Sequence, residues 1–341
     1  MKRILTGIRT SGPLHLGHYI GALKIWVDLQ HKDYECFFLL ADIQALTTHA
    51  DDPKLIQESV KDTVLDFLAA GLDPTKDNVN FVLQSAIPEI SELTTYFTMV
   101  TPFAWVQKNP TIKEELKQLS KGATLGFMNY PVSQAADILM VSHDPKDSEE
   151  PVLVPVGDDQ VPHIESTNHV SRAFNNAYGK TFGECKALIG NFGRLVGLDG
   201  NSKMSKSLNN CIYLKDEKEE VRKKIMSMYT DPKRIHPDDP GTVEGNPVFI
   251  YHDAFNEDKK EVEDLKKRYK EGTVGDVEVK EKLFDAIEKF LEPIRKRRKE
   301  FEGKDIMKYV ADGTRKAQEI AIGNVDRARK AMGLDYPTIR Q

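Results

Sequence analysis

Two histidines near the start of the chain have the spacing and the surroundings of an anion-binding site. His15 and His18 lie in the stretch GPLHLGH, which follows a short apolar run and precedes an apolar helical pattern. A helix N-terminus offers unpaired N–H groups and the positive end of its dipole, which favour phosphate. Imidazoles can donate to phosphate oxygens, and Gly12 and Gly17 let a ligand approach the backbone. Two ordinary surface histidines are the alternative. A metal site is disfavoured because no further ligand has a recognisable spacing, and we predict no protein-held metal.

A second polar cluster lies in the stretch GLDGNSKMSKSLNN, where residues 203–207 read KMSKS. A loop with two lysines and two serines can stabilise negative charge that grows on a pyrophosphate during a reaction. A solvated basic turn is the alternative for this loop taken alone. The two motifs together, at the two ends of one α/β region, favour nucleotide chemistry.

A third set of polar residues is spaced as one face of a helix. In YPVSQAADILM, Tyr130, Gln134 and Asp137 stand at i, i+4 and i+7, and Pro131 suits the first turn of that helix. A carboxylate on such a face can accept a hydrogen bond from a ligand bound in front of it. Tyrosine and tryptophan are the two amino acids with a donor at the far end of an aromatic ring. A helix-surface carboxylate is the alternative, but the small and apolar neighbours favour a crowded site.

Strands and helices must bring these distant residues together. Apolar runs typical of buried strands occur in RILTGI, ECFFLLAD, VNFVLQS and EPVLVPV. Helical patterns separate them, and one helix over residues 53–70 ends at Gly71, a residue suited to a C-cap. This alternation predicts an α/β fold with a parallel sheet whose ligands bind at the carboxyl ends of the strands.

The residue pattern of the chain changes after about residue 211, where charge-rich amphipathic helical patterns follow one another. We therefore predict a C-terminal domain that is all helical. The predicted boundaries are 1–212 for the sheet-containing domain and 213–312 for the helical one, with a final helix within 313–341 packing back on the first domain.

Composition sets the broad class. The chain has 341 residues, a formal net charge of −5, and 40% hydrophobic and 30% charged residues, which suits a globular protein of two domains. No apolar run approaches the roughly 20 residues of a membrane span, and the first residues do not form a secretion signal. The three cysteines are odd in number and far apart, which argues against a disulfide framework. We expect a cytoplasmic protein without a membrane partner.

The pair of motifs, HLGH and KMSKS, resembles the signature of class I aminoacyl-tRNA synthetases. Over essentially its whole length the chain is similar to the tryptophanyl branch, through YPVSQAADIL, VPVGDDQVPHIESTNHVSRAFN, MSMYTDP and AMGL. The resemblance implies a Rossmann-like catalytic domain with a C-terminal all-helical tRNA-binding domain. It also implies that ATP activates an amino acid as its adenylate, and that the aminoacyl group then passes to tRNA.

The resemblance also implies site residues, with His15, His18, Lys203 and Lys206 as the catalytic group that grips ATP. The residues expected to contact ATP are Arg9, Thr10, Ser11, Gly17, His18, Gly157, Asp158, Asp159, Arg194, Lys203, Met204, Ser205, Lys206 and Ser207. Those expected to contact the amino acid are Leu5, Gly7, Tyr130, Gln134, Asp137, Val154, Val156 and Gln160. By the resemblance, Asp137 would accept the indole N–H of tryptophan.

Three positions depart from the tryptophanyl pattern. Relatives tend to carry phenylalanine at Leu5, histidine at Gln44 and methionine at Gln134, and tyrosyl enzymes share the Tyr-x-x-x-Gln-x-x-Asp spacing. Tyrosyl enzymes, however, usually need a tyrosine where Leu5 stands. We therefore predict a tryptophan–tRNA ligase, with a tyrosine–tRNA ligase of the same class as the alternative.

The expected partners are L-tryptophan, ATP with Mg²⁺, and tRNA(Trp), and the resemblance implies a homodimer. The densest basic cluster, residues 295–299, is the candidate tRNA contact, with a solvated helix face as the alternative. Residues 91–127 are the candidate dimer interface, with a buried core face as the alternative. Two rival classes are an adenylating enzyme that uses no tRNA and a regulatory protein without catalysis. The intact KMSKS loop with its helical domain disfavours the first, and both intact motifs disfavour the second.

Overall fold

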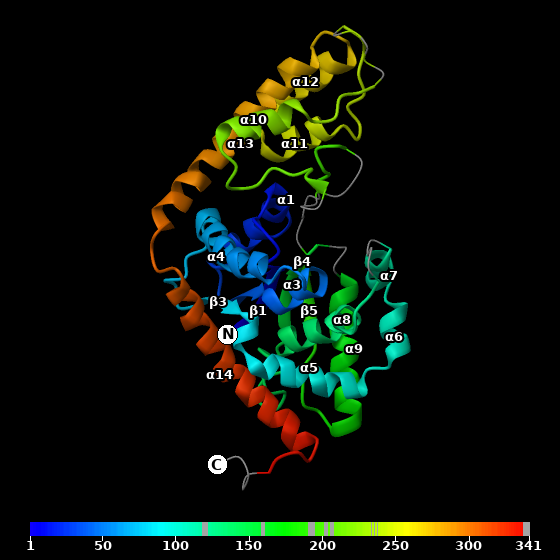
Figure 1. Ribbon diagram of the computed structural model, residues 1–341, viewed down its shortest axis with the longest axis vertical. Coiled ribbons are helices and arrows are strands. Elements are labelled where there is room, and N and C mark those ends of the chain that lie inside the picture. The colour runs from blue at the N-terminus through cyan, green and yellow to red at the C-terminus, as the bar shows by residue number, and fades with distance from the viewer. Residues whose placement is uncertain are drawn as a thin grey trace.

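The computed structural model describes residues 1–117, 122–157, 161–189, 195–200, 204, 208–232, 234, 236 and 238–336. Figure 1 shows a sheet wrapped by helices in the lower part of the molecule and a group of helices at its upper end. The described helices include none that is both long and apolar enough to cross a membrane.

Five strands form the sheet, in the spatial order β3-β2-β1-β4-β5, and all its pairs are parallel. They are β1 (Lys2–Arg9), β2 (Tyr34–Ala41), β3 (Val79–Leu83), β4 (Val152–Val156) and β5 (Cys185–Ile189). In the β1–β2 pair, Lys2 lies opposite Tyr34 and Arg9 opposite Ala41. The parallel sheet and its surrounding helices confirm the predicted Rossmann-like α/β fold. All carboxyl ends of the strands therefore meet at one edge.

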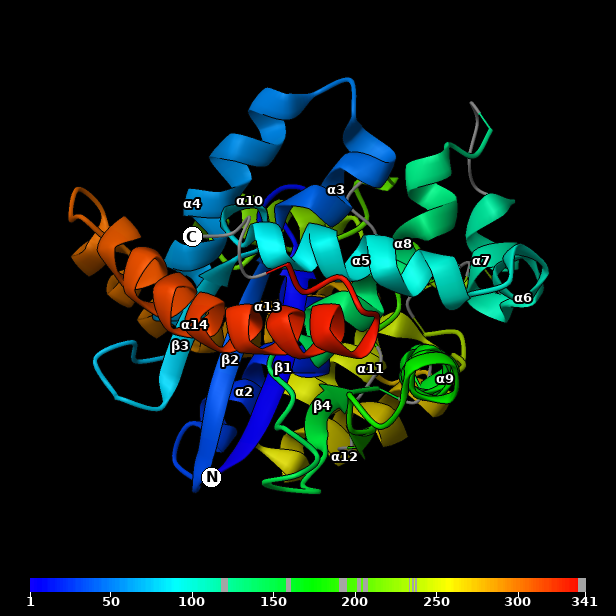
Figure 2. The same cartoon turned by 90° about the horizontal axis from the view of Figure 1, so that it is seen from below.

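Helices cover both faces of this sheet, as Figure 2 shows from below. Those that precede β5 are α1 (Leu16–His18), α2 (Lys24–Leu29), α3 (Asp42–His49), α4 (Pro53–Ala70), α5 (Pro88–Val100), α6 (Phe103–Lys108), α7 (Pro110–Leu116), α8 (Leu125–Leu139) and α9 (Val161–Tyr178). A π-helical turn, η1 (Tyr19–Leu23), joins α1 to α2, and a 3-10 turn, η2 (Gln84–Ala86), follows β3. The helix predicted over 53–70 is confirmed as α4, and Gly71 caps it with a φ of 110°.

Two helix starts differ from the sequence prediction. α8 begins at Leu125, six residues before Pro131, because the Thr124 hydroxyl caps it by accepting from the Phe127 N–H at 3.1 Å. Proline within a helix costs one backbone hydrogen bond, and α8 buries nine of its side chains, including Tyr130 and Asp137, in return. The opening helix begins at Leu16, so Gly17 and His18 lie in its first turn rather than in the preceding loop.

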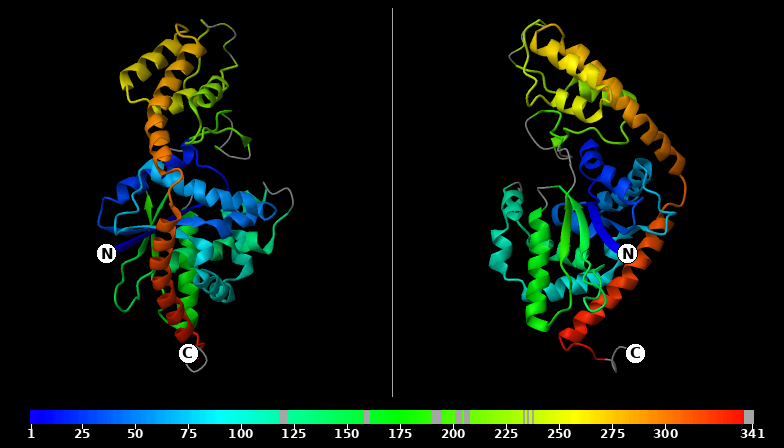
Figure 3. Two further views of the ribbon diagram at one scale, coloured as in Figure 1. Left: turned by 60° about the vertical axis from the view of Figure 1, so that its left-hand side comes forward. Right: turned by 180° about the vertical axis from the view of Figure 1, so that it is seen from behind.

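The C-terminal helices confirm the predicted all-helical region. They are α10 (Lys218–Met226), α11 (Pro247–Phe255), α12 (Lys259–Lys270), α13 (Asp276–Phe301) and α14 (Met307–Ala331). α10 to α13 pack on one another at one end of the molecule, and α14 runs back along the sheet-containing part (Figure 3). Leu83 N–H donates to the Thr314 hydroxyl at 2.9 Å, which fixes α14 beside β3.

Neighbouring residues of β2 supply two separate hydrophobic clusters, one on each face of the sheet. Phe38 packs with Trp26, Phe67 and Phe81 in the first. Phe37 belongs to the second, which rests on α5 and α8. A strand buried on both faces explains why ECFFLLAD has no polar alternation.

Candidate active site

The HLGH motif forms the first turn of a helix with its two imidazoles side by side. His15 is the N-cap residue, and its own N–H donates to Nδ1 of His18 at 3.1 Å. The two ring centroids lie 3.7 Å apart. In a neutral imidazole, an Nδ1 that accepts leaves the proton on Nε2. His18 therefore presents a donor at Nε2, in the first turn of the helix.

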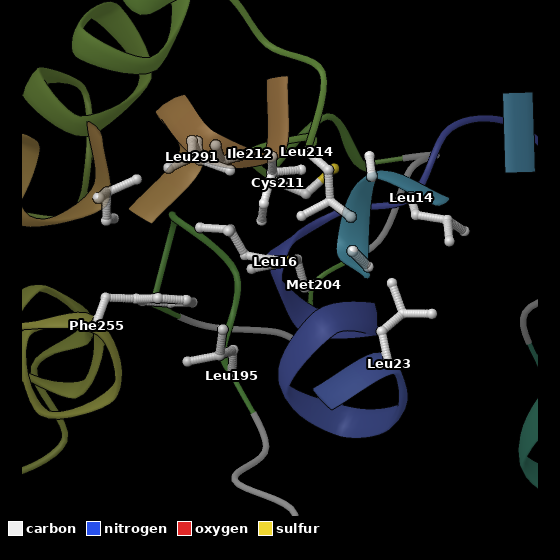
Figure 4. Close-up of a cluster of buried hydrophobic side chains, with 14 of the residues drawn as sticks. Leu14, Leu16, Leu23, Leu195, Met204, Cys211, Ile212, Leu214, Phe255 and Leu291 are labelled. Atoms are coloured by element: carbon white, nitrogen blue, oxygen red, sulfur yellow. The ribbon is translucent and has the colours of Figure 1, made fainter. Parts of the chain in front are cut away.

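One residue of the KMSKS motif lies against this turn. The Gly17 N–H points to Sδ of Met204 at 3.3 Å, and the Met204 side chain is buried. Figure 4 shows Met204 beside Leu16 within the hydrophobic cluster under the loop. A Cβ at Gly17 would lie 3.0 Å from the His15 ring and 3.2 Å from that sulfur. Glycine is thus the residue that lets the two motifs meet.

Backbone pairing fixes the segment after the KMSKS motif to the same loop. The Leu16 N–H donates to the Ile212 carbonyl at 3.0 Å, and the Leu214 N–H donates to the Leu14 carbonyl at 2.9 Å. His15 and Tyr213 form an antiparallel bridge between them. These contacts join two segments about 200 residues apart in the chain.

The end of β1 supplies polar groups at the same sheet edge. The Arg9 guanidinium lies 5.0 Å from the centre of the Tyr130 ring. Thr10 is fully buried, and its hydroxyl finds no hydrogen-bond partner among the residues that the structure describes. Ser11 N–H donates to the Arg9 carbonyl at 2.9 Å and turns the chain. The buried Thr10 hydroxyl is therefore available to a ligand.

Asp137 is buried on α8 and is bound by two glutamine amides. Gln84 Nε2 donates to its two carboxylate oxygens at 2.8 and 3.0 Å, and Gln44 Nε2 donates to Oδ2 at 2.6 Å. Burial raises the pKa of Asp137 to about 7, although the hydrogen bonds from the glutamines oppose that rise and the charge of Asp42 adds to it. The carboxyl is 2% exposed, so it does not face solvent as a surface carboxylate would.

The other described residues predicted to contact the amino acid differ in burial. Leu5, Val154 and Ala136 belong to one buried cluster, whereas Gln134 and Val156 are half-buried. Gly7 is exposed, and a Cβ there would lie 2.7 Å from the Leu39 carbonyl oxygen.

Tyr130 is buried between charged groups. Burial and the charge of Glu115 hold the pKa of the Tyr130 hydroxyl above its usual value, against the opposing charge of Arg9. Tyr130 also lines a cavity of about 310 Å³ between α3, α5 and α8, together with Gln44 and Ser133. Gln44 therefore connects the cavity wall to the buried carboxylate.

Gln84 is the residue that sequence reasoning missed, and Gln44 was noticed there only as a departure from relatives. The available signal was position, because Gln84 directly follows β3 at the carboxyl edge of the sheet. Gly157 follows β4 at the same edge and is half-buried. Eight predicted site residues lie outside the described residues: Asp158, Asp159, Gln160, Arg194, Lys203, Ser205, Lys206 and Ser207.

The basic cluster at 295–299 is wrong as a continuous tRNA contact, because two of its arginines point into the protein. Arg298 is 7% exposed and donates to the carboxylates of Asp62 and Asp66. Arg295 is 8% exposed and pairs with Glu288.

Among the described residues, no group of three or more His, Cys, Asp and Glu side chains could hold a metal ion.

The chain is similar to known proteins over nearly its whole length. Residues 1–292 match the family described as tRNA synthetases class I (W and Y). The chain is 45% identical to the tryptophan–tRNA ligase of Clostridium longisporum, across 98% of the chain and 97% of the relative. It is 46% identical to that of Streptococcus pneumoniae, across 98% of both. Among solved structures, the Campylobacter jejuni tryptophanyl-tRNA synthetase, complexed with ADP and tryptophan, superposes with a TM-score of 0.81. It shares 30% identity and covers 97% of this chain and 100% of that one.

Proposed function

The chain belongs to the class I tRNA synthetases of the tryptophan and tyrosine group, and we propose that it activates L-tryptophan with ATP and transfers it to tRNA(Trp). The reaction has two steps. The tryptophan carboxylate attacks the α-phosphate of ATP, so that tryptophanyl-adenylate forms and diphosphate leaves. A ribose hydroxyl of the tRNA then takes the tryptophanyl group and releases AMP.

The contact of Met204 with Gly17 is the observation that carries the proposal. It places the described part of the KMSKS motif at the helix start that holds His15 and His18. Positive groups at that point can stabilise the charge that moves onto the leaving diphosphate. Arg9, Thr10 and Ser11 would hold other phosphate oxygens, because Arg9 ends β1 at the same edge and the other two follow it directly.

The proposed roles of the site residues outside the described part of the chain rest on the family resemblance. Lys203 and Lys206 would supply positive charges, Ser205 and Ser207 further donors, and Gly157 with Asp158 and Asp159 the ribose contacts. Arg194 would lie near adenine, and Gln160 would hold the α-amino group together with Tyr130. These roles remain proposals of the family resemblance.

The buried Asp137 favours tryptophan as the substrate over an amino acid whose ring carries no hydrogen-bond donor. Its buried carboxylate can accept the indole N–H, and Leu5, Val154 and Val156 would enclose the ring. Tyrosine is disfavoured because the leucine at position 5 cannot share a hydrogen bond with a phenol.

The partners of the reaction follow from its substrates. Mg²⁺ would accompany ATP and neutralise part of its charge, held chiefly by the phosphates. Residues 213–312 would form the tRNA-binding domain, with 1–212 and the last helix as the catalytic one. The family's homodimer is supported by three exposed apolar side chains within residues 91–127: Met99, Phe103 and Leu125 are 69%, 60% and 86% exposed. We also propose a cytoplasmic location, since the three cysteines are buried and form no disulfide.

Amino-acid-dependent ATP–pyrophosphate exchange, measured across all twenty amino acids and followed by charging of tRNA, tests this proposal. We expect exchange with tryptophan alone and charging of tRNA(Trp). Exchange with tyrosine would support the alternative specificity, and exchange without charging would support an adenylating enzyme of another class.

A further inference from the structure

The hydrogen bonds that link Asp137, Gln84 and Gln44 form a closed ring, in which the donor and the acceptor of each bond are fixed. The backbone N–H of Gln44 donates to Oε1 of Gln84 at 3.1 Å. An amide whose oxygen accepts there must turn its NH₂ group the other way, and that group faces Asp137. Gln44 completes the network with a second amide donor at Oδ2. Both neighbours of the carboxylate are therefore donors, and they favour the ionised form of Asp137, which is an acceptor only.

The network leaves one oxygen of the carboxylate with spare capacity. Oδ2 receives N–H groups from both glutamines, whereas Oδ1 receives only the one from Gln84. A carboxylate offers about four lone-pair sites, so Oδ1 is the atom with more room for a ligand donor.

Backbone contacts hold the two glutamines rigidly. Gln84 is fully buried at the start of η2, and Gln44 is 8% exposed in α3. Oδ1 of Asp42 accepts from the Ser85 N–H at 2.9 Å and from the Ile43 N–H at 3.1 Å, which ties η2 to the start of α3. The two amides thus approach Asp137 from elements that are fixed to each other.

We propose that Gln84 and Gln44 are positioning residues that set specificity for tryptophan: they favour the ionised form of Asp137 and aim its Oδ1 at the indole N–H. The inference rests on the proposed function, since it needs tryptophan as the ligand. Without these donors, burial would raise the pKa of the carboxyl further, and Asp137 would keep its proton to higher pH. The glutamines counter that tendency, so the site keeps an acceptor where the ring needs one.

Two substitutions at Gln84 test the proposal by different means. Gln84→Met fills similar space without a donor. The kcat/KM for tryptophan in ATP–pyrophosphate exchange should fall on the order of 10²-fold, with the loss in KM rather than kcat, because hydrogen bonds to a charged group are lost. Selectivity for tryptophan over β-(3-benzothienyl)alanine, whose ring has sulfur in place of N–H, should fall with it.

Gln84→Glu keeps the shape but places a second carboxyl against Asp137. Two carboxyls in contact share one proton, so the pair should work only while it keeps that proton. The kcat/KM for tryptophan should then decline above neutral pH, in the range where the unsubstituted enzyme does not decline. A merely structural role for Gln84 would not produce a fall in kcat/KM above neutral pH.

Gln30→Met is the matched control. Gln30 is a buried glutamine (3% exposed) that donates to the Gly71 carbonyl at 2.9 Å and accepts from the Asp73 N–H at 2.9 Å, far from Asp137 in the fold. The Gln30→Met substitution should lower the stability of the protein without changing its selectivity for the ring or the pH profile of kcat/KM. If the unsubstituted enzyme itself fails to prefer tryptophan over the sulfur analogue, the proposed function of Asp137 fails. If it does prefer tryptophan, but both Gln84 variants keep that preference and the parent pH profile, the positioning role alone is refuted.

Discussion

A buried ion pair between α4 and α13 carries the most quantitative prediction about the fold. Arg298 on α13 donates to Asp62 at 2.7 Å and to Asp66. Asp66 is fully buried and also accepts the Leu14 N–H at 2.9 Å, directly beside His15. The pair therefore joins the helical C-terminal part to the loop of the HLGH motif.

Arg298→Met should destabilise the protein by about 3–5 kcal/mol, because it leaves a buried carboxylate without its cation. The pH dependence of this loss has a definite sign. Burial raises the pKa of Asp66 to about 6, with Arg298 as the main opposing influence. Since that pKa lies above the unfolded value of about 3.9, ionisation of Asp66 costs stability as pH rises from about 4 to 6. Removal of Arg298 raises the pKa further, so the deficit should be larger at pH 8 than at pH 5.

Urea unfolding of the variant at the two pH values measures the effect. Arg268→Met is the control, since Arg268 and Glu278 form an exposed pair whose side chains are 34% and 48% exposed, and its loss should cost no more than about 1 kcal/mol. A loss at Arg298 as small as the control's, or one independent of pH, would refute the reasoning.

Three other changes test the site and the surface. Gly17→Ala should raise KM for ATP at least about tenfold, because its Cβ would press on the His15 ring and the Met204 sulfur. In exchange assays Gly21→Ala is its control, since an added Cβ there meets nothing within 4 Å. The kcat/KM for tryptophan should rise with pH and level off above about 7, because burial raises the pKa of Asp137 to about 7 and only the ionised carboxylate accepts the indole N–H. A profile that is flat through neutral pH would contradict this. Phe103→Glu should shift a dimer toward monomer in sedimentation, whereas Val277→Glu, at a 69% exposed position on α13, should leave the mass unchanged.

The strands could be predicted from sequence because each is a nearly continuous apolar run between turn residues. β2 is buried at its last six positions, and such a run has few other structures open to it. The start of α8 could not be predicted, because Pro131 is a strong local signal for a first turn. The Thr124 cap and the burial of the whole helix outweigh that signal, and both depend on tertiary packing.

Some residues of the candidate site could likewise be predicted from the sequence, and others could not. His15, His18 and Asp137 are singled out by motif spacing together with the family resemblance, and the structure places the histidines at a helix start and buries Asp137. Gln84 could not be predicted, since a glutamine after a strand is ordinary until the fold brings it to Asp137. The tRNA contact predicted from the charge density at 295–299 failed for a related reason. The sequence does not show that Arg298 pairs with buried carboxylates.

The most direct test of the central claim is the ratio of kcat/KM for tryptophan to that for β-(3-benzothienyl)alanine in ATP–pyrophosphate exchange. A site that recognises a buried donor rejects the ring lacking it by about 10⁴-fold, so we predict a ratio of that order in the unsubstituted enzyme and a ratio near one in Asp137→Leu. A ratio within about tenfold of one in the unsubstituted enzyme would show that the site selects the ring by shape alone and would contradict the role of Asp137.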